Sequence, residues 1–461
     1  MPIQFPSNPT INQSYTYNSR TWTWSGTRWI VKFGIGSNPK DITWLTTQTS
    51  NFTALAGFGY PVDTTSSAIT VTLPQNPSSG DQVQLLDYAG TWATNIVTVA
   101  RNGSNINGIA SNIFLDTNRG ASTLTYVDST QGWVGSGGAG GGSIYGLFYK
   151  ADPSTVAFTK TGAGTAQIKA RTRIEVGGTM VTFFSNTTIT MPSLTVGTNY
   201  AIWVKDDATI QATSNYSSAP GAGNWRRIGG FHYAPGGNAT GTSGGDTTPA
   251  INEYSLWDLK FRPSCPDPRG MTLVADSFWA DIYLLGVDHI TNGTSAYNVT
   301  IADGSSPPKL PTKFGGNGTA TYGAMTWWNT NDVLRSYGKR PPTYDEFAAL
   351  AYGTTEASSD GTDPVSTILR NAYTSKWGVM LATGNIQVWG ADFGGGAAAA
   401  SYAANTGGRG TTYQMENVAL FGGGFLGTSN SGSRSSIWSN SLNYGASTIG
   451  GRGVCDHLIL D

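Results

Sequence analysis

The chain has 461 residues, of which 61 are glycine and 12% are charged, and its 27 lysines and arginines nearly balance its 28 aspartates and glutamates. An ordinary soluble domain has about twice this share of charged residues. Without a basic excess, the chain is not expected to bind nucleic acid through its phosphates. The hydrophobic fraction of 38% excludes a disordered chain, and the abundant glycine and aromatic residues favour a mostly β protein with many turns.

The start of the chain lacks the basic and apolar stretches of a signal peptide, and no run of about 18 apolar residues could span a bilayer. We therefore expect synthesis in a cytoplasm with neither export nor membrane insertion. Two cysteines, Cys265 and Cys455, cannot form a disulfide framework, and three histidines disfavour a histidine-built zinc site. No metal ion and no cofactor are expected.

Residues 1–37 alternate aromatic with small polar side chains. The segments 15–17 and 22–24 have the period-two pattern of strands with one apolar face. Because so short a segment cannot bury its aromatic side chains alone, we expect this amino-terminal module to pack against copies of itself and to serve in trimerisation or attachment.

Residues 38–134 form a second β-rich module of short strands separated by turns. Strands are expected at 68–73, 83–86 and 96–99. The run of glycine and serine at 135–144 has the composition of a flexible linker and predicts a domain boundary.

Residues 145–260 return to the strand pattern, now as hairpins. Gly177–Gly178 favours a tight hairpin over 173–183, and Asp206–Asp207 marks another over 201–210. This block is expected to be a small antiparallel β-sandwich.

Residues 261–461 have a different, loop-rich pattern, for which we predict an α+β domain. Thr343 and Glu346 form a capping box that opens a helix, and Gly353 supplies its stop. A second short helix is expected at 331–337.

Three spaced carboxylates, Asp276, Asp281 and Asp288, lie near aromatic residues and could serve the hydrolysis of a glycan. Spacing along the chain cannot establish the separation that this chemistry requires. We therefore interpret them as turn and strand-end carboxylates on a folded surface.

Two other groups offer weaker indications of a chemical site. Cys455, Asp456 and His457 combine a thiol, a carboxylate and an imidazole, but on a strand Asp456 faces away from the other two, and a buried structural cysteine is the favoured interpretation. Residues 328–332 are similar to the calcium-binding stretch of sugar-binding lectins, yet at a helix start their Asn and Asp are expected to cap. We predict no catalytic site and no metal site.

Five long motifs follow one another in order through the last two thirds of the chain. They are Asn252–Asp258, Asp267–Ala275, Phe278–Val287, Ala404–Gly410 and Gly453–Leu460. Together they resemble the major tropism determinant family of bacteriophage tail-fibre proteins over about residues 150–461, whereas residues 1–145 depart from it.

This resemblance implies a receptor-binding adhesin at the distal tail fibre of a virion, made in the cytoplasm of the host. The family implies a homotrimer whose C-type-lectin-like domain, here 261–461, displays a variable surface to a bacterial surface protein or glycan. Other tail-fibre proteins would be its partners in the virion. The resemblance also implies that the chain is not an enzyme and that the separate reverse transcriptase of a diversity-generating retroelement rewrites its gene. A tail-spike glycan hydrolase and a calcium-dependent sugar-binding lectin are the alternatives.

The same resemblance assigns eleven variable, receptor-binding positions. They are Gly424, Leu426, Thr428, Asn430, Ile437, Ser439, Asn440, Tyr444, Ala446, Thr448 and Ile449. Residues 424–430 and 444–448 step by two, which predicts one face of an extended segment, with Phe425 and Ser429 among the residues that face the scaffold. Trp438 and Arg434 are interpreted as framework, and Trp438 is expected to be buried.

Overall fold

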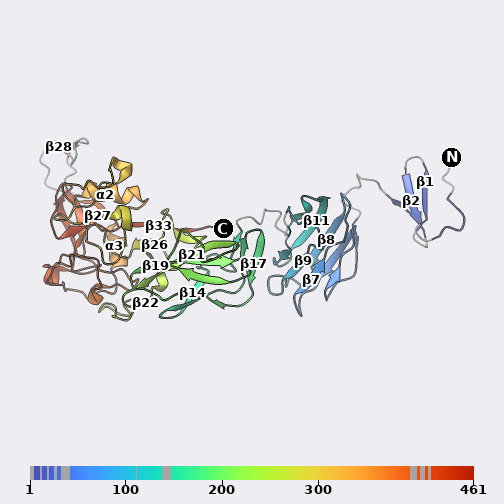
Figure 1. The fold of residues 1–461 in the computed structure, drawn as a ribbon, viewed down its shortest axis with the longest axis horizontal. Coiled ribbons are helices and arrows are strands. Elements are labelled where there is room, and N and C mark those ends of the chain that lie inside the picture. Colours follow the sequence, from blue (N-terminus) through green and yellow to red (C-terminus); the bar gives the residue numbers. More distant parts are fainter. Residues whose placement is uncertain are drawn as a thin grey trace. The chain divides into compact units, whose positions relative to one another are not determined.

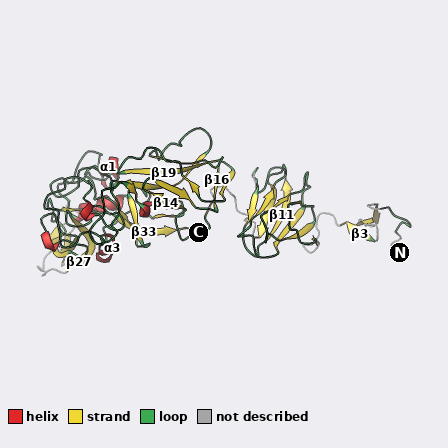
Figure 2. Cartoon of the chain, turned by 90° about the horizontal axis from the view of Figure 1, so that it is seen from below, coloured by secondary structure: helices red, strands yellow, loops and turns green. Residues whose placement is uncertain are grey.

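The computed structural model describes residues 5–460, except 11–12, 18–19, 25–27, 33–41, 109, 111, 138–146, 395–401, 405–410 and 414–416. The chain divides into two compact units, residues 1–146 with 178–180, and residues 147–177 with 181–461 (Figure 1). Strands dominate both units, and the α-helices of the described residues all belong to the second (Figure 2). None of these helices is long and apolar enough to cross a membrane.

The chain begins with a three-stranded antiparallel meander of β1 (Ser14–Tyr17), β2 (Arg20–Trp24) and β3 (Trp29–Lys32). The strands predicted around residues 15–17 and 22–24 are confirmed. Phe5 stacks on Trp29 at 5.1 Å between ring centroids, and Trp22 is only 7% exposed. The premise that one copy cannot bury these rings is therefore wrong for Trp22, because the aromatic side chains cover one another within the chain.

Residues 42–137 form two facing sheets, and up to residue 100 successive strands alternate between them. One sheet has the order β12-β11-β8-β6-β4 and the other the order β10-β9-β7-β5, with parallel pairing from β4 to β8 and from β5 to β9. The bounds are β4 (Thr43–Trp44), β5 (Phe52–Thr53), β6 (Phe58–Val62), β7 (Ile69–Thr72), β8 (Gln82–Asp87), β9 (Val97–Ala100), β10 (Ile113–Leu115), β11 (Ala121–Asp128) and β12 (Gly132–Gly137). Alternate apolar side chains of both sheets fill one core, as the period-two pattern predicted.

The linker prediction for 135–144 is wrong at its start. Gly135–Gly137 continue strand β12, where they pair with residues 122–124 of β11, so these glycines are held by the sheet ladder. The remainder of the predicted linker lies outside the described residues.

Residues 147–260 fold as antiparallel sheets around a single core. Both predicted hairpins form: Gly177 and Gly178 adopt φ values of +58° and +86° in the turn between β16 and β17, and β19 pairs with β20. The strands are β13 (Phe148–Tyr149), β14 (Phe158–Gly162), β15 (Thr165–Ile168), β16 (Thr172–Val176), β17 (Thr179–Phe183), β18 (Thr187–Thr188), β19 (Thr198–Lys205), β20 (Ile210–Thr213), β21 (Trp225–Ala234), β22 (Ala250–Ile251) and β23 (Trp257–Asp258).

In the part of residues 261–461 that the structure describes, the strands form two four-stranded sheets and a two-stranded ribbon. The first sheet has the order β24-β33-β26-β25 and the second the order β31-β30-β27-β32, so the last strand of the chain lies inside the first sheet. The bounds are β24 (Phe261–Pro263), β25 (Met271–Val274), β26 (Phe278–Asp281), β27 (Gln387–Gly394), β28 (Tyr402–Ala404), β29 (Thr411–Tyr413), β30 (Asn417–Phe421), β31 (Ser436–Ser441), β32 (Ile449–Gly450) and β33 (Val454–Ile459). Ala404 ends β28, and the rest of the motif 404–410 lies outside the described residues.

The predicted helix after Thr343 is present as α3 (Tyr344–Leu350). The Glu346 carboxylate accepts a hydrogen bond from the Thr343 backbone N–H at 2.9 Å, and Phe347 and Leu350 are buried. Helix α2 (Trp327–Ser336) begins four residues earlier than predicted, because Thr326 caps it by accepting from the Asn329 N–H. The short helix α1 (His289–Asn292), capped by Asp288, was not predicted.

Two buried cations tie the parts of this region together. The Arg452 guanidinium, fully buried, donates hydrogen bonds to the backbone carbonyls of Asp281, Ile282, Met380 and Leu381 at 2.6–3.2 Å. The Lys339 ammonium donates to Asp281 Oδ1 at 2.5 Å and to Thr294 Oγ1 at 2.7 Å. Burial alone would lower the pKa of Lys339, but the adjacent Asp281 outweighs burial and the pKa lies above its ordinary value.

Candidate functional site

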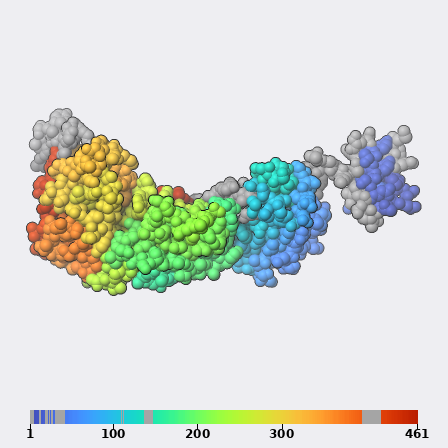
Figure 3. All heavy atoms as spheres, in the orientation of Figure 1, coloured from blue at the N-terminus to red at the C-terminus, as the bar shows by residue number. Residues whose placement is uncertain are grey.

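The eleven predicted contact positions lie on the two edge strands of the sheet β31-β30-β27-β32 and in the loops beside them, with Ile449 on β32, at the edge opposite to β31. Ile437, Ser439 and Asn440 lie on β31, the edge strand, and the others lie in the loop 422–435 before it or in the segment 442–449 after it. Orange-red and red atoms of this last stretch of the chain are visible at the left of the space-filling view (Figure 3). The fold therefore brings residues up to 25 positions apart in the sequence to this sheet and the loops beside it.

Exposure separates these positions into three groups. Leu426, Ile437 and Tyr444 are 69%, 40% and 48% exposed, and Thr428, Asn430 and Ser439 are also exposed. Gly424, Asn440, Ala446 and Thr448 are half-buried. Ile449 is 1% exposed and packs with Trp389 and Leu442 in the core beneath, so the prediction that it contacts a receptor is wrong for its side chain in this structure.

The extended segments predicted at 424–430 and 444–448 are also wrong. The loop turns at 425–426 and continues as a 3-10 helix over Thr428–Asn430, and the segment after β31 is a second set of turns. Gly422 and Gly423 start the loop with φ values of +91° and +76°, a conformation that breaks the strand pattern. As a result Ser429 is exposed although it was predicted to face the scaffold, whereas Phe425 does pack on the core.

Hydrogen bonds from residues 356–361 hold the loop 422–435 in place. The Glu356 carboxylate accepts from the Ser433 N–H at 3.0 Å and from the Ser433 hydroxyl at 2.6 Å. Ser359 Oγ accepts from the Thr428 N–H at 3.0 Å, and the Phe425 carbonyl accepts from the Gly361 N–H at 2.9 Å. Among the loop residues in these contacts only Thr428 is a predicted variable position, and it uses its backbone N–H, so its side chain can change without loss of the contact.

A shallow groove of about 670 Å³ opens on this surface. Its lining includes five of the eleven positions, namely Gly424, Leu426, Asn430, Ile437 and Thr448, and Arg434 is the one charged residue in the lining that the structure describes. Such a groove can accept a partner through apolar contacts and neutral hydrogen bonds, with its shape set by exchangeable side chains.

Trp438 lies among these positions and is 39% exposed, so its predicted burial is wrong. Its ring packs on Tyr344 and Phe421, with centroids 5.9 and 6.2 Å away, and its Nε1–H donates to Ser436 Oγ. On an edge strand both faces can reach solvent, and this accounts for the exposure of 437, 438 and 439 in succession.

The three carboxylates considered for glycan hydrolysis have separate roles. Asp281 is fully buried and paired with Lys339, Asp288 caps α1 and pairs with Lys309 at 2.8 Å, and Asp276 lies in a turn with a φ of +52°. The description as turn and strand-end carboxylates is confirmed for Asp276 and Asp288, but Asp281 is not at the surface.

The other two candidate groups, residues 455–457 and residues 328–332, also have structural roles. Cys455 and Cys265 are buried free thiols, and Asp456 faces outward to pair with Arg340, as the strand alternation predicted. Residues 328–332 lie within α2 and not at its start. Among the described residues, no group of three His, Cys, Asp or Glu side chains could hold a metal ion.

Comparison with known proteins places the chain among phage tail-fibre proteins. A family model described as the Mtd second domain matches residues 156–258. The tail fiber receptor-binding protein of Bordetella phage BPP-1 is 57% identical over 325 residues, which are 68% of this chain and 85% of that protein. The chain belongs to this family of phage tail-fibre receptor-binding proteins.

Solved structures agree with this relationship. The U1 variant of the Major Tropism Determinant is 53% identical, with a TM-score of 0.69 over 73% of this chain and 95% of that chain. The I1 variant is 52% identical, with the same TM-score over 74% of this chain and 93% of that chain. The resemblance found in the sequence motifs is thereby confirmed, and so is a mostly β fold with few helices.

Proposed function

We propose that this chain is a phage tail-fibre adhesin that binds a bacterial surface receptor through the loop 422–435, strand β31 and the segment 442–448. The observation that carries the proposal is the groove whose lining combines Gly424, Leu426, Asn430, Ile437 and Thr448. These residues were assigned as variable on sequence alone, and the fold brings them together from three separate segments.

Binding at such a surface depends on a rigid backbone that presents exchangeable side chains. The contacts of Glu356, Ser359 and Gly361 hold the loop, while the exposed Leu426 and Tyr444 offer apolar area to a partner. Antibody paratopes use the same combination of rigid aromatic anchors and adaptable polar groups. Ile449, below the surface, would act by shaping the loop above it.

The finer assignments form part of the same proposal. Residues 261–461 act as a C-type-lectin-like domain, residues 145–260 as the β-sandwich behind it, and residues 1–37 and 38–134 as modules for trimerisation and attachment. Three chains assemble into a homotrimer at the distal tail fibre, where they meet other tail-fibre proteins. Three sites in one trimer raise the effective affinity through avidity. The chain binds without chemistry, and a retroelement diversifies the eleven positions.

Binding of the purified protein to host cells tests the adhesin. Leu426→Asp should abolish cell binding and leave the melting temperature unchanged, because the side chain is 69% exposed. Phe184→Asp, which changes a side chain 70% exposed in the β-sandwich, is the matched control and should bind normally. Equal loss in both variants would contradict the site. Release of reducing sugar from host envelope, or binding that EDTA abolishes, would point instead to a hydrolase or to a calcium-dependent lectin.

The gene sequences of many sibling phages test the diversification. Substitutions should concentrate at the eleven positions and leave Phe425, Trp438 and Cys455 unchanged. An even spread of changes over residues 261–461 would contradict the retroelement while leaving the adhesin proposal intact.

A further inference from the structure

The two cysteines of the chain lie opposite each other on neighbouring backbone segments. Strand β24 pairs with β33 in antiparallel register. This pairing continues beyond the end of β24, because the Ser264 N–H donates a hydrogen bond to the Asp456 carbonyl at 2.9 Å. One residue further along, the same register sets Cys265 against Cys455.

The position in the ladder decides how close the two backbones come. The Lys260 carbonyl accepts from the Leu460 N–H at 2.8 Å, four residues before the bond that Ser264 donates. Hydrogen-bonded and non-hydrogen-bonded pairs alternate along an antiparallel ladder, so the two cysteines form a non-hydrogen-bonded pair. The Cα atoms of such a pair are about 4.5 Å apart, which is within the range of about 4.4–6.8 Å that a disulfide spans.

The two side chains point to the same side of the sheet. Cys265 and Cys455 are 1% and 3% exposed and belong to one buried cluster with Met271 and Trp279. Cys265 Sγ lies 3.4 Å from Met271 Sδ, and Cys455 Sγ lies 3.9 Å from the same atom. Both thiols therefore converge on one point of the core.

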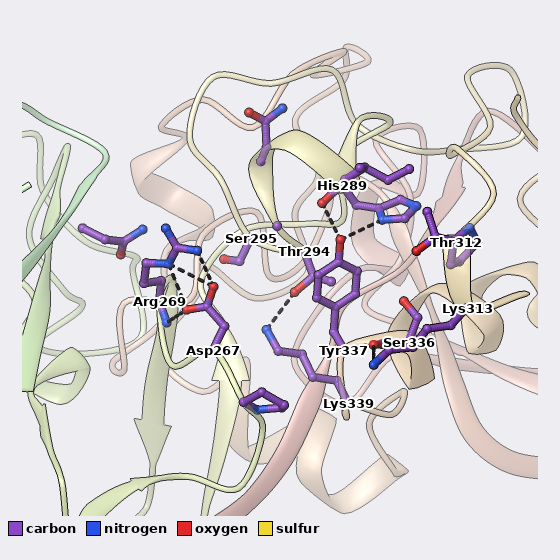
Figure 4. A pocket seen from close by; sticks show the side chains of 16 residues that line it. Asp267, Arg269, His289, Thr294, Ser295, Thr312, Lys313, Ser336, Tyr337 and Lys339 are labelled. Atoms are coloured by element: carbon purple, nitrogen blue, oxygen red, sulfur yellow. Dashed lines mark hydrogen bonds and ion pairs between the residues drawn. The ribbon is translucent and has the colours of Figure 1, made fainter. Parts of the chain in front are cut away.

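The surroundings of the pair activate one thiol. A hydrogen bond with the Cys265 side chain lowers the pKa of Cys455 from 9.0 to about 7, and the same interaction, with burial, raises the pKa of Cys265. The positive charge of Lys339 also favours the Cys455 thiolate. Lys339 lines a pocket of about 440 Å³ with Pro266 and Asp267, the two residues that follow Cys265 (Figure 4). A water-sized oxidant in this pocket therefore reaches the residues next to the pair.

We infer that Cys265 and Cys455 form an intrachain disulfide when the folded protein meets a peroxide. The Cys455 thiolate attacks one peroxide oxygen and becomes a sulfenic acid, while the O–O bond breaks and the other oxygen leaves as hydroxide, which takes up the proton that Cys455 had released. The Cys265 sulfur then attacks the Cys455 sulfur, and the S–O bond breaks as a second water leaves with the Cys265 proton. Two thiols lose two electrons in total, and one peroxide is reduced to two waters.

The disulfide closes a ring that contains residues 265–455, and with them the proposed receptor groove. A cross-link removes conformational freedom from the unfolded chain, and it removes more when the closed loop is long. The oxidised domain should therefore resist unfolding better than the reduced one. Cytosolic reductants keep thiols reduced, so this gain arises in a tail fibre that has left the host cell.

Treatment of the reduced, folded full chain with hydrogen peroxide tests the inference. Both thiols should become unreactive toward Ellman's reagent, and mass spectrometry of a digest should find Cys265 joined to Cys455 of the same chain. The melting temperature should rise by several degrees, and dithiothreitol should reverse the rise. Cys265→Ala and Cys455→Ala are the matched controls, and in each the peroxide should leave the melting temperature unchanged.

Refolding from urea in a buffer of oxidised and reduced glutathione separates slow access from unsuitable geometry, because both thiols are exposed in the unfolded chain. The same disulfide should form there. Two free thiols per refolded chain, a mixed disulfide with glutathione, or an oxidised protein that melts below the reduced one would overturn the inference. So would a disulfide that forms only on refolding, or peroxide that adds oxygen to Met271 instead. None of these outcomes depends on host-cell binding.

Discussion

Single side chains at the predicted contact positions and beside them differ in their exposure to solvent. Leu426 and Tyr444 stand in solvent, Trp438 is an aromatic ring half supported by Tyr344 and Phe421, and Ile449 is part of the core. Substitution at Ile449 therefore changes packing under the loop, while substitution at Leu426 changes the contact itself.

Tyr444→Ala should leave stability within about 0.5 kcal/mol, as expected of a surface substitution, and should weaken receptor binding by about 2 kcal/mol or more, roughly thirtyfold. Trp438→Ala should cost less than about 2 kcal/mol of folding free energy, because its ring is 39% exposed. Trp389→Ala, at a fully buried ring, serves as the control and should cost about 3–5 kcal/mol. Urea unfolding and cell-binding titration measure these effects, and a Trp438 variant as unstable as the Trp389 variant would contradict the exposed position.

His232 predicts a pH dependence of stability. It is buried between Asn199 and Tyr283, and burial lowers its pKa from 6.5 to about 3. The unfolded chain then binds a proton that the folded chain excludes, so its stabilising contribution is complete above about pH 6.5 and is lost as the pH falls toward 3. The slope reaches about 1.4 kcal/mol per pH unit.

Urea unfolding between pH 7 and pH 4 tests this dependence, with His232→Gln as the comparison. Part of the dependence should remain in the variant, because burial also lowers the pKa of His289 and His457. Identical slopes for both proteins would show that His232 does not carry the effect.

At the scale of elements, the conformation of the loop 422–435 depends on Glu356, a residue that is not expected to touch a receptor. Glu356 binds the Ser433 backbone and hydroxyl, and its loss would free the loop without changing any contact residue. Glu356→Ala should weaken receptor binding severalfold by raising the cost of ordering the loop, with a small change in melting temperature. Glu253→Ala, at another exposed glutamate, is the control, and unchanged binding by the Glu356 variant would contradict the bracing role.

The strands with clear period-two patterns were predictable, and so were the double-glycine hairpin and the α3 capping box, because each depends on residues close in sequence. The shape of the variable surface was not. Gly422 and Gly423 turn the chain just before residue 424. Residues 424–430 then form turns and a 3-10 helix, so the spacing of two between the predicted contact positions does not mark an extended strand. Trp438 was misplaced because edge position depends on which strands pair across the fold.

For the whole molecule, the main prediction is that three chains assemble into a homotrimer. Light scattering on the intact protein should give three times the chain mass of 48.5 kDa. The family resemblance implies three chains. In addition, three weak sites in one trimer have a higher effective affinity through avidity. A monomer at micromolar concentration would contradict the trimer, and deletion of residues 1–37 shows whether the aromatic meander is needed for it.

The place of β33 also governs the order in which the chain can fold during synthesis. This last strand lies between β24 and β26, and Arg452 just before it holds the carbonyls of residues 281–282 and 380–381. Residues 261–461 therefore cannot complete this sheet until β33 has been translated, which happens after residues 422–449 have been translated. A chain cut short anywhere in that stretch lacks both the central strand and the clamp. Only chains that extend through β33 can therefore form both the complete sheet and the Arg452 contacts.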